Sequence, residues 1–422
     1  MRLRYNYRVH PDAPQRRALA RAFGCARVVF NDGLRARREA HEADLPYIKD
    51  TDLQKRVITA AKRTDERAWL GEVSSVVLVQ SLRDLHTAYR NFFSSVTGKR
   101  KGPKVAPPCF KSKRDSRQSI RLTANGFCLR ESGRLYVAKV GDLDVRWSRP
   151  LPTVPTSVTV TKDAADRYWA SFVVDTDPKI LSELDTETGI DLGLAHFAVL
   201  SDGRKVDSPR FLRRAEKKLK RLQKSLARCE EGSKNRAKAR RKAARQHARV
   251  ADRRRDWHHK ESTKIIRENQ AVYVEDLAVS GLGRTRLAKS VHDAGWSQFV
   301  SMLEYKARRH GRTFGRIGRF EPTSQVCSAC GVKDGPKPLS VRGWTCGNCG
   351  SVHDRDINAA RNILAAGRAD RPNACGARVR RASVPAQCGE AGTHRDGRTA
   401  VAGIQVLRGP VDVNNPIFIH FA

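Results

Sequence analysis

The sequence has no run of 18 apolar residues and no amphipathic stretch with a broad apolar face. It therefore predicts neither a membrane-spanning helix nor a helix on a membrane surface. Residues 1–7 contain no hydrophobic segment of the signal-peptide type. Acidic residues are few, since 44 Asp and Glu stand against 82 Lys and Arg, a formal net charge of +38. Because such a charge favours a polyanionic partner, we expect a cytoplasmic, nucleoid-associated protein that binds nucleic acid, with no membrane and no small-molecule substrate.

Ten cysteines in 422 residues do not indicate a disulfide framework in a cytoplasmic chain. Two C-x-x-C pairs, fifteen residues apart, are formed by Cys327, Cys330, Cys346 and Cys349. Their number and spacing predict one structural Zn²⁺, although an iron centre also fits four cysteines. Four thiolates leave no open coordination position, so this metal is expected to hold the fold only. The other six are predicted to be small core residues or inert thiols: Cys25, Cys109, Cys128, Cys229, Cys375 and Cys388.

Two aspartates follow the last cysteine closely. Asp354 lies at the expected start of a helix, where its side chain can accept hydrogen bonds from free backbone N–H groups. Asp356 shares a helical face with the small and apolar residues Ala359, Ala360 and Ile363. The other face carries the polar residues Asp354, Asn358 and Asn362. We therefore expect the Asp356 carboxylate to point inward, with no local cation to pair with it.

Two further carboxylates are predicted at buried or strand-end positions. Asp191 lies in a nearly continuous apolar stretch at residues 188–200, and a buried aspartate needs a partner or a metal ion. Glu275 follows a short buried strand at 271–274, and reactive groups lie at the carboxyl ends of strands in open α/β sheets. If these two acids meet Asp356, their repulsion raises one or more pKa values. Two Mg²⁺ ions would relieve that repulsion and support hydrolysis of a phosphodiester.

The N-terminal half predicts a small antiparallel β-domain with an inserted helical bundle. Residues 2–9 alternate between apolar and mainly basic side chains, which is typical of a half-buried strand. Asp12 is a candidate N-cap for the first helix, and a second helical block covers about 72–95. The aromatic residues of these helices are predicted to be core rather than contacts for bases. Short strands are predicted at 118–122, 127–130, 134–138, 143–147, 157–161 and 167–174, which the first strand could complete into a barrel.

Two segments are dense in positive charge. Residues 98–114 form a proline-containing loop, which is either a solvated surface or a nucleic-acid contact. Its candidate contacts are Lys99, Arg100, Lys101, Lys104, Phe110, Lys111 and Lys113.

Residues 210–255 hold 20 Lys and Arg but 4 Asp and Glu, in a predicted two-helix hairpin that spans about 210–260. Because the acids needed for pairing along a helix are scarce, we expect phosphate contacts there. The candidates are Arg213, Arg214, Lys217, Lys220, Arg221, Arg240 and Arg241.

After this hairpin, the apolar spacing predicts an amphipathic helix at about 287–310 and a strand at 312–319. Residues 187–207 predict a β-hairpin, because Ser201-Asp202-Gly203 is a turn signal. The order of elements from residue 187 is therefore a β-hairpin, two basic helices, a strand, a helix, a strand, the cysteine segment and a final helix.

The chain resembles the TnpB (OrfB) family of transposon-encoded proteins, which are relatives of type V CRISPR effector nucleases. The resemblance rests on the motifs at 189–193, 274–277 and 354–360 and on the two C-x-x-C pairs, and it covers about residues 1–390. It implies an RNA-guided DNA endonuclease with a RuvC-type RNase H-like domain. Asp191, Glu275 and Asp356 would be its catalytic, Mg²⁺-binding acids. Its implied partners are a guide RNA from the transposon end and double-stranded target DNA.

The expected fold is multidomain, α/β plus α+β. The domains are a wedge-like β-barrel (1–12 and 98–186), a helical recognition domain (13–97), a RuvC-type nuclease domain (187–326 and 351–367), a zinc ribbon (327–350) and a tail expected to be disordered (368–422). Two alternative functions stay open. One is a DNA transposase or resolvase-like protein that acts without RNA, and the other is a guide-dependent repressor that binds DNA without cutting it.

Overall fold

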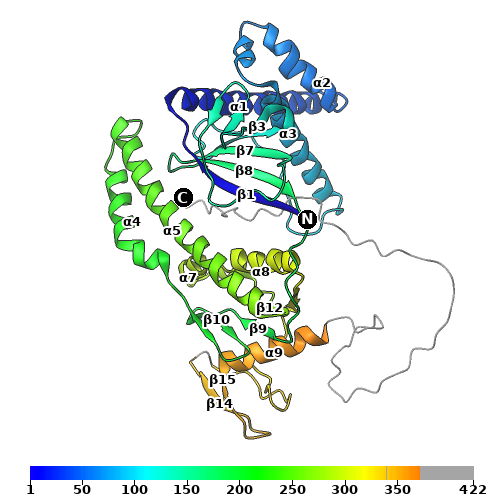
Figure 1. The fold of residues 1–422 in the computed structure, drawn as a ribbon, viewed down its shortest axis with the longest axis vertical. Helices are drawn as coiled ribbons and strands as arrows, with labels where there is room; N and C mark the ends of the chain where they lie inside the picture. The colour runs from blue at the N-terminus through cyan, green and yellow to red at the C-terminus, as the bar shows by residue number, and fades with distance from the viewer. Residues whose placement is uncertain (339, 371–422) are drawn as a thin grey trace, which may run out of the picture.

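The computed structural model describes residues 1–338 and 340–370 (Figure 1). Its N-terminal half contains a five-stranded antiparallel sheet with the strand order β2-β7-β8-β1-β6. The strands are β1 (Arg2–Val9), β2 (Gln118–Thr123), β6 (Val145–Arg146), β7 (Ser157–Lys162) and β8 (Tyr168–Asp175). Every second residue of β1 is buried, as the alternation in the sequence predicts. The first strand thus joins strands that lie more than a hundred residues later in the chain.

A second, three-stranded antiparallel sheet lies beside the first. Its strands are β3 (Phe127–Leu129), β4 (Leu135–Val137) and β5 (Gly141–Leu143). The strands predicted at 118–122, 127–130, 134–138, 157–161 and 167–174 are found, whereas the one predicted at 143–147 is divided between β5 of this sheet and β6 of the first, and the single closed barrel is not observed. In the described residues β2 and β6 each pair with one named strand, so the five-stranded sheet stays open. Tight turns with positive φ at Gly133 and Lys139 connect β3, β4 and β5, which pair with one another and not with β2 or β6, so they form a separate sheet.

The helices between β1 and β2 pack on these sheets in one shared core. They include α1 (Ala13–Glu42), α2 (Asp50–Gln54), a π-helix (Lys55–Ala60) and α3 (Ser75–Val96), with 3₁₀ turns at Ala61–Arg63, Ala68–Glu72 and, after β2, Ala124–Gly126. The Asp12 side chain accepts a 2.8 Å hydrogen bond from Gln15 N, as predicted for an N-cap. Leu19 and Phe30 of α1 belong to the same buried cluster as Phe172 of β8. Helices and sheets therefore support each other.

The C-terminal half is built on a mixed sheet with the strand order β11-β10-β9-β12-β13. Its strands are β9 (Glu187–Asp191), β10 (His196–Leu200), β11 (Lys205–Asp207), β12 (Ala271–Glu275) and β13 (Thr313–Ile317). β9, β12 and β13 are parallel, whereas β10 and β11 are antiparallel to their neighbours. Figure 1 shows α8 on one side of this sheet and α9 on the other. The strands β9, β10 and β12 are therefore largely buried, as their nearly continuous apolar residues predict, whereas the edge strands β11 and β13 are more exposed.

The helices around this sheet are α4 (Phe211–Ala227), α5 (Lys234–Glu268), α6 (Val279–Leu282), α7 (Ala288–Ala294), α8 (Trp296–His310) and α9 (Arg355–Ala369). α4 and α5 form the predicted basic hairpin, and Ser233 caps α5 by accepting a 3.1 Å hydrogen bond from Arg236 N. The single helix predicted at 287–310 is wrong. Gly295 has a left-handed backbone with φ of +67°, which divides it into α7 and α8.

The cysteine segment contains one antiparallel pair of strands, β14 (Gly343–Thr345) and β15 (Val352–Asp354). α9 follows β15 directly and continues to Ala369, so residues 368 and 369 are helical and do not belong to a disordered tail. The rest of the expected tail, residues 371–422, lies outside the described residues. Among the described helices, none is long and apolar enough to cross a membrane.

Candidate active site and metal centre

Two of the predicted acids lie at the same edge of the central sheet. Asp191 is the last residue of β9, and Glu275 is the last residue of β12. These strands are adjacent and parallel, with Ile190 opposite Val274. The next residue on each strand is the acid. Because parallel strands present their carboxyl ends at one edge, the pairing register brings these acids together from positions 84 residues apart in the sequence.

The third acid comes from the first turn of α9. Asp354 caps this helix as predicted, because its Oδ1 accepts hydrogen bonds of 3.1 Å from both Asp356 N and Ile357 N. Lys205 Nζ lies 2.6 Å from the other Asp354 oxygen. Although burial raises the pKa of Asp354, the hydrogen bonds from Lys205 and from the backbone hold it below its ordinary value. Asp354 is thus fully engaged in structure, which leaves Asp356 as the acid available to the site.

All three acids line one pocket of about 650 Å³. Its wall also contains four cationic side chains and a segment that leads towards the first cysteine pair: Arg319, Lys333, Arg342, Arg355 and residues 320–325. The convergence that was predicted from helical phase and strand ends is therefore observed. Among the described residues, however, these acids do not form a group whose ligand atoms lie close enough together to hold a metal ion, whereas the four cysteines do.

The electrostatics of the pocket favour a bound cation. Burial, followed by the charges of Asp356 and Glu275, raises the pKa of Asp191 to about 7, against the smaller opposing effect of Arg355 and Arg342. Burial and then the charge of Asp276 also raise the pKa of Glu275. Carboxyl groups that resist ionisation in this way are typical of functional sites. A divalent cation would stabilise their charged forms.

Asp356 is not free of a local cation, so that prediction is wrong. Arg342 Nη1 lies 3.3 Å and 3.5 Å from the two carboxylate oxygens of Asp356. The arginine comes from the loop before β14, and Arg355 N donates a 2.7 Å hydrogen bond to Arg342 O. The ion pair therefore joins the cysteine segment to the helix that carries the acid.

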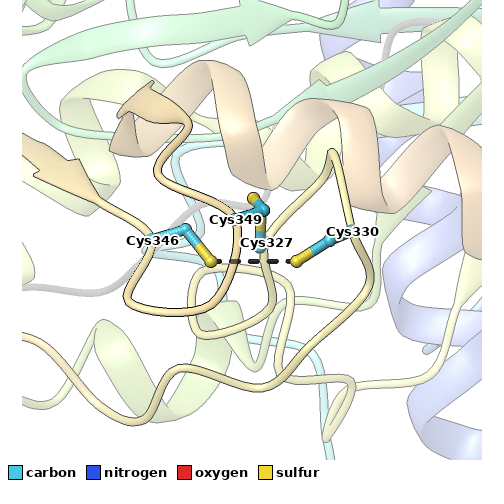
Figure 2. Close-up of side chains that lie close together, drawn as sticks. All are labelled: Cys327, Cys330, Cys346 and Cys349. Carbon is cyan, nitrogen blue, oxygen red and sulfur yellow. Dashed lines mark hydrogen bonds between the residues drawn. The ribbon is translucent and has the colours of Figure 1, made fainter.

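The four predicted cysteines form a candidate metal centre. Their sulfur atoms all lie within 4.8 Å of one another (Figure 2). The Cys330 and Cys346 sulfurs are 3.7 Å apart, as are those of Cys327 and Cys349. Such a cluster could bind a zinc ion. His353, the residue directly before Asp354, places its Nε2 3.0 Å from Cys327 Sγ. It thus connects the cysteine cluster to the start of α9.

Two asparagines of α9 have a structural role that the sequence did not indicate. The predicted polar face of the helix is in fact covered, and Asn358 is only 1% exposed. Asn358 Nδ2 donates to Val326 O at 2.8 Å, and Asn362 Nδ2 donates to Val326 O at 2.7 Å and to Thr323 O at 2.8 Å. Ser328 N donates to Asn358 Oδ1 at 2.8 Å. The base of the cysteine segment is therefore fixed to the helix of Asp356.

The cationic loop between α3 and β2 is exposed at five of its predicted contacts: Lys99, Arg100, Lys101, Lys104 and Lys113. Phe110 is also exposed, with the Arg38 guanidinium 4.8 Å from its ring centre. Lys111 differs from the others. Its Nζ lies 3.9 Å from the centre of the Phe30 ring, and burial lowers its pKa. A surface contact in this loop would therefore come from residues other than Lys111.

The seven predicted contacts of the α4–α5 hairpin are all exposed. Three of them have partners, since Arg213 donates to Ser290 at 3.2 Å, Lys220 pairs with Glu216 at 3.0 Å and Arg241 pairs with Asp166 at 3.2 Å. The other four have no ion-pair partner within the described part of the chain: Arg214, Lys217, Arg221 and Arg240. Three of these, Arg214, Lys217 and Arg221, share one face of α4 at spacings i, i+3 and i+7.

Comparison with known proteins defines the class to which this chain belongs. Family models described as "Helix-turn-helix domain", "Probable transposase" and "Cas12f1-like, TNB domain" match residues 1–45, 171–286 and 296–363. A Streptomyces pristinaespiralis protein named "Putative RNA-guided DNA endonuclease" is 42% identical over 410 residues, which cover 96% of this chain and 98% of that protein. The Escherichia coli K12 protein "Putative RNA-guided DNA endonuclease InsQ" is 32% identical and covers 86% and 92% of the two chains.

The chain therefore belongs to the TnpB (OrfB) family, as its motifs indicate. Among solved structures, the Cas12f1–sgRNA–target DNA complex matches with a TM-score of 0.49 and 15% identity. This match covers 82% of the present chain and 81% of the Cas12f1 chain.

Proposed function

We propose that this protein is an RNA-guided, Mg²⁺-dependent DNA endonuclease of a bacterial insertion sequence. The observation that carries the proposal is the single pocket lined by Asp191, Glu275 and Asp356, which come from three remote segments. The names of the two relatives support the same activity. The mixed sheet with an acid at the end of β9 and another at the end of β12 fits a RuvC-type RNase H-like domain.

The acids of the pocket fit Mg²⁺, because oxygen ligands are those that this ion prefers. Burial and then the charges of Asp356 and Glu275 raise the pKa of Asp191, and a bound cation would offset both effects. We assign Asp191, Glu275 and Asp356 as its ligands, with two ions as the expected number. When bound, Mg²⁺ supplies activation of the attacking water and stabilisation of the leaving oxygen. The pocket cations Arg319, Lys333, Arg342 and Arg355 then orient the phosphodiester over the acids.

The four cysteines hold one structural Zn²⁺ in this proposal. Their metal does not react with the substrate, because four thiolates fill its coordination sphere. It fixes the segment that carries Arg342 and supports the first turn of α9. The cysteine cluster thus positions Asp356 through His353 and the two buried asparagines.

Nucleic acid is held by the exposed cations of the α4–α5 hairpin and of the loop at 98–113. Guide RNA and double-stranded target DNA are the proposed partners. The proposed domains are a wedge-like domain at 1–12 and 98–186, a recognition domain at 13–97, a nuclease domain at 187–326 and 351–367, and a zinc ribbon at 327–350. The first two share one core, which also includes Met302 and Tyr305 of α8 in the proposed nuclease domain.

A cleavage assay tests the proposal. The protein is purified with the RNA that accompanies it, that RNA is sequenced, and a matching DNA target is offered with Mg²⁺. We expect cleavage of the matched target only. Asp191→Ala or Asp356→Ala should abolish cleavage while RNA binding remains, whereas Asp202→Ala, which changes an exposed turn residue, should cleave normally.

Three outcomes would contradict the proposal in different ways. Cleavage that survives complete RNase treatment would favour a transposase or resolvase-like protein that acts without RNA. Tight, guide-dependent DNA binding by the wild type without any cleavage would favour a repressor. Loss of RNA binding in the Asp191→Ala variant would contradict the separate roles of the acids and the basic surfaces.

A further inference from the structure

One aromatic residue that lines the acidic pocket contributes little to the core of the protein. Phe320 is 93% exposed and lines the same pocket as Asp191, Glu275 and Asp356. Apolar burial stabilises folded proteins, so a ring left almost wholly in water gains almost nothing from the fold. An exposed aromatic ring that shares a pocket with cations is a combination on which nucleobases stack.

The backbone that carries Phe320 is anchored on both sides to the elements of the acids. On one side, the Arg319 guanidinium donates to Asp276 Oδ2 at 2.7 Å and to Asp276 O at 3.1 Å, and Asp276 directly follows Glu275. On the other side, Thr323 O accepts the 2.8 Å hydrogen bond from Asn362 on α9. The backbone on either side of Phe320 is therefore tied to β12 and to the helix of Asp356.

The surroundings of the ring match the chemistry of a single nucleic-acid strand. Four cations line the same pocket: Arg319, Lys333, Arg342 and Arg355. Arg319 is paired with Asp276 and Arg342 with Asp356. Cations that follow a phosphate backbone together with an exposed aromatic ring are the combination that binds single strands, because every base offers a π-face for stacking. A base paired within a duplex has both faces covered by its neighbours and cannot stack on a side chain in this way.

We propose that Phe320 is a base-stacking site, which holds an unpaired nucleobase of the DNA strand next to the phosphate that lies over the acids. This inference rests on the proposed function for the identity of the strand, and it adds a contact that selects single-stranded DNA and fixes which phosphate enters the pocket. Phe320 does not take part in the chemistry. Its role is to bind and position the strand.

Fluorescence of 2-aminopurine tests this contact directly, because stacking on an aromatic ring quenches it. The probes are single-stranded oligodeoxynucleotides with one 2-aminopurine at successive positions, bound to the full chain with Asp191→Asn to prevent cleavage. We expect strong quenching at one position. Phe320→Leu keeps an apolar side chain but no ring, so it should abolish the quenching and weaken single-strand binding by about 5- to 150-fold. Phe320→Tyr keeps an aromatic ring, so it should retain the quenching and the wild-type affinity for single strands.

Cleavage by otherwise wild-type protein provides the second measurement. Phe320→Leu should raise KM for a target with an unpaired strand and spread the cut over neighbouring phosphates, with a smaller change in kcat. Val154→Ala, which changes another highly exposed apolar residue, is the control and should have no effect. Thermal stability and bound zinc should be unchanged in Phe320→Leu, Phe320→Tyr and Val154→Ala, because these side chains are highly exposed.

The outcomes separate this inference from the function on which it rests. Suppose that the wild type cleaves a guided target, and that Phe320→Leu has the same single-strand affinity, 2-aminopurine quenching and cleavage as the wild type. The proposed stacking site is then wrong, while the proposed nuclease function stands. If quenching depends on Phe320 while the wild type never cleaves, the stacking site stands and the proposed function is wrong. A Phe320→Leu variant with lowered thermal stability would show that the ring packs against protein instead, and would also overturn the inference.

Discussion

Gly189 on β9 lies directly against the backbone of Ala360 on α9. A Cβ atom at position 189 would be 2.2 Å from Ala360 O and 2.5 Å from Leu364 N. These contacts are with backbone atoms, so no side chain can rotate to make room. The absence of a side chain at Gly189 therefore lets α9 pack onto the strand that ends in Asp191.

We predict that Gly189→Ala separates α9 from the sheet. The overpacking should lower the free energy of unfolding by about 1–3 kcal/mol, and it should reduce DNA cleavage strongly because Asp356 moves away from Asp191. Chemical denaturation and a cleavage assay measure the two effects. Gly24→Ala is the matched control, because a Cβ at Gly24 in α1 meets nothing within 4 Å. This control should be as stable as the wild type or slightly more so.

Replacement of Asp191 by asparagine should stabilise the protein in the absence of Mg²⁺. Burial and the neighbouring acids raise the pKa of Asp191 to about 7 in the folded state, whereas it is about 3.9 in an unfolded chain. Between these values the unfolded chain releases the proton and the folded protein keeps it, so the wild type loses stability as the pH rises. Asparagine does not ionise. The stabilisation by Asp191→Asn should therefore grow from about pH 4 to about pH 7 and be constant above.

Urea unfolding of the zinc-loaded protein at pH 5, 6, 7 and 8 measures this difference, which we expect to reach roughly 1–4 kcal/mol. Asp256→Asn is the control, since Asp256 is exposed on α5 and pairs with Lys260 at 2.8 Å. A difference that does not change with pH would show that Asp191 is not perturbed. Addition of Mg²⁺ should reverse the order of stability, because the ion binds the charged form of the wild-type site.

Local patterns in the sequence were sufficient to predict much of the acidic site. Asp191 and Glu275 end apolar strands, and helical phase separates Asp356 from the capping Asp354. Arg342 could not be predicted as the partner of Asp356, because it lies fourteen residues earlier and reaches the acid only when β14 pairs with β15. Helical phase also could not show that the cysteine segment covers Asn358 and Asn362.

Long-range packing explains the remaining differences. The strands of the N-terminal half were predicted from alternation and turns, but whether a sheet closes depends on contacts between its edges. The break between α7 and α8 depends on the backbone conformation of Gly295, which the apolar spacing on either side does not reveal. The exposure of Phe320 could not be predicted either, because an isolated aromatic residue next to a cysteine motif is equally consistent with a core position.

Loss of the metal at the cysteine cluster should loosen the first turn of α9 without unfolding the rest of the protein. Cys349→Ser removes one of the four sulfur ligands, so bound zinc should fall from one per chain to near zero. Hydrogen exchange should then increase over residues 321–363, and cleavage should be lost. Cys128→Ser, an exposed cysteine of β3, is the control. Metal analysis of the wild type also distinguishes zinc from iron, and finding iron would contradict the zinc assignment.

The unpaired cations of α4 should contribute to nucleic-acid affinity through phosphate contacts. Arg214, Lys217 and Arg221 lie on one face of the helix, and each phosphate contact adds about 0.9 to the slope of log affinity against log salt concentration for duplex DNA. The triple alanine variant should therefore bind every duplex sequence more weakly and lower that slope by up to about 3. Arg308→Ala on α8 is the control, because Arg308 already forms an ion pair of 2.5 Å with Glu304 of α8. Equal slopes for the triple variant and the wild type, measured between 50 and 200 mM salt, would show that this face of α4 does not contact the phosphate backbone.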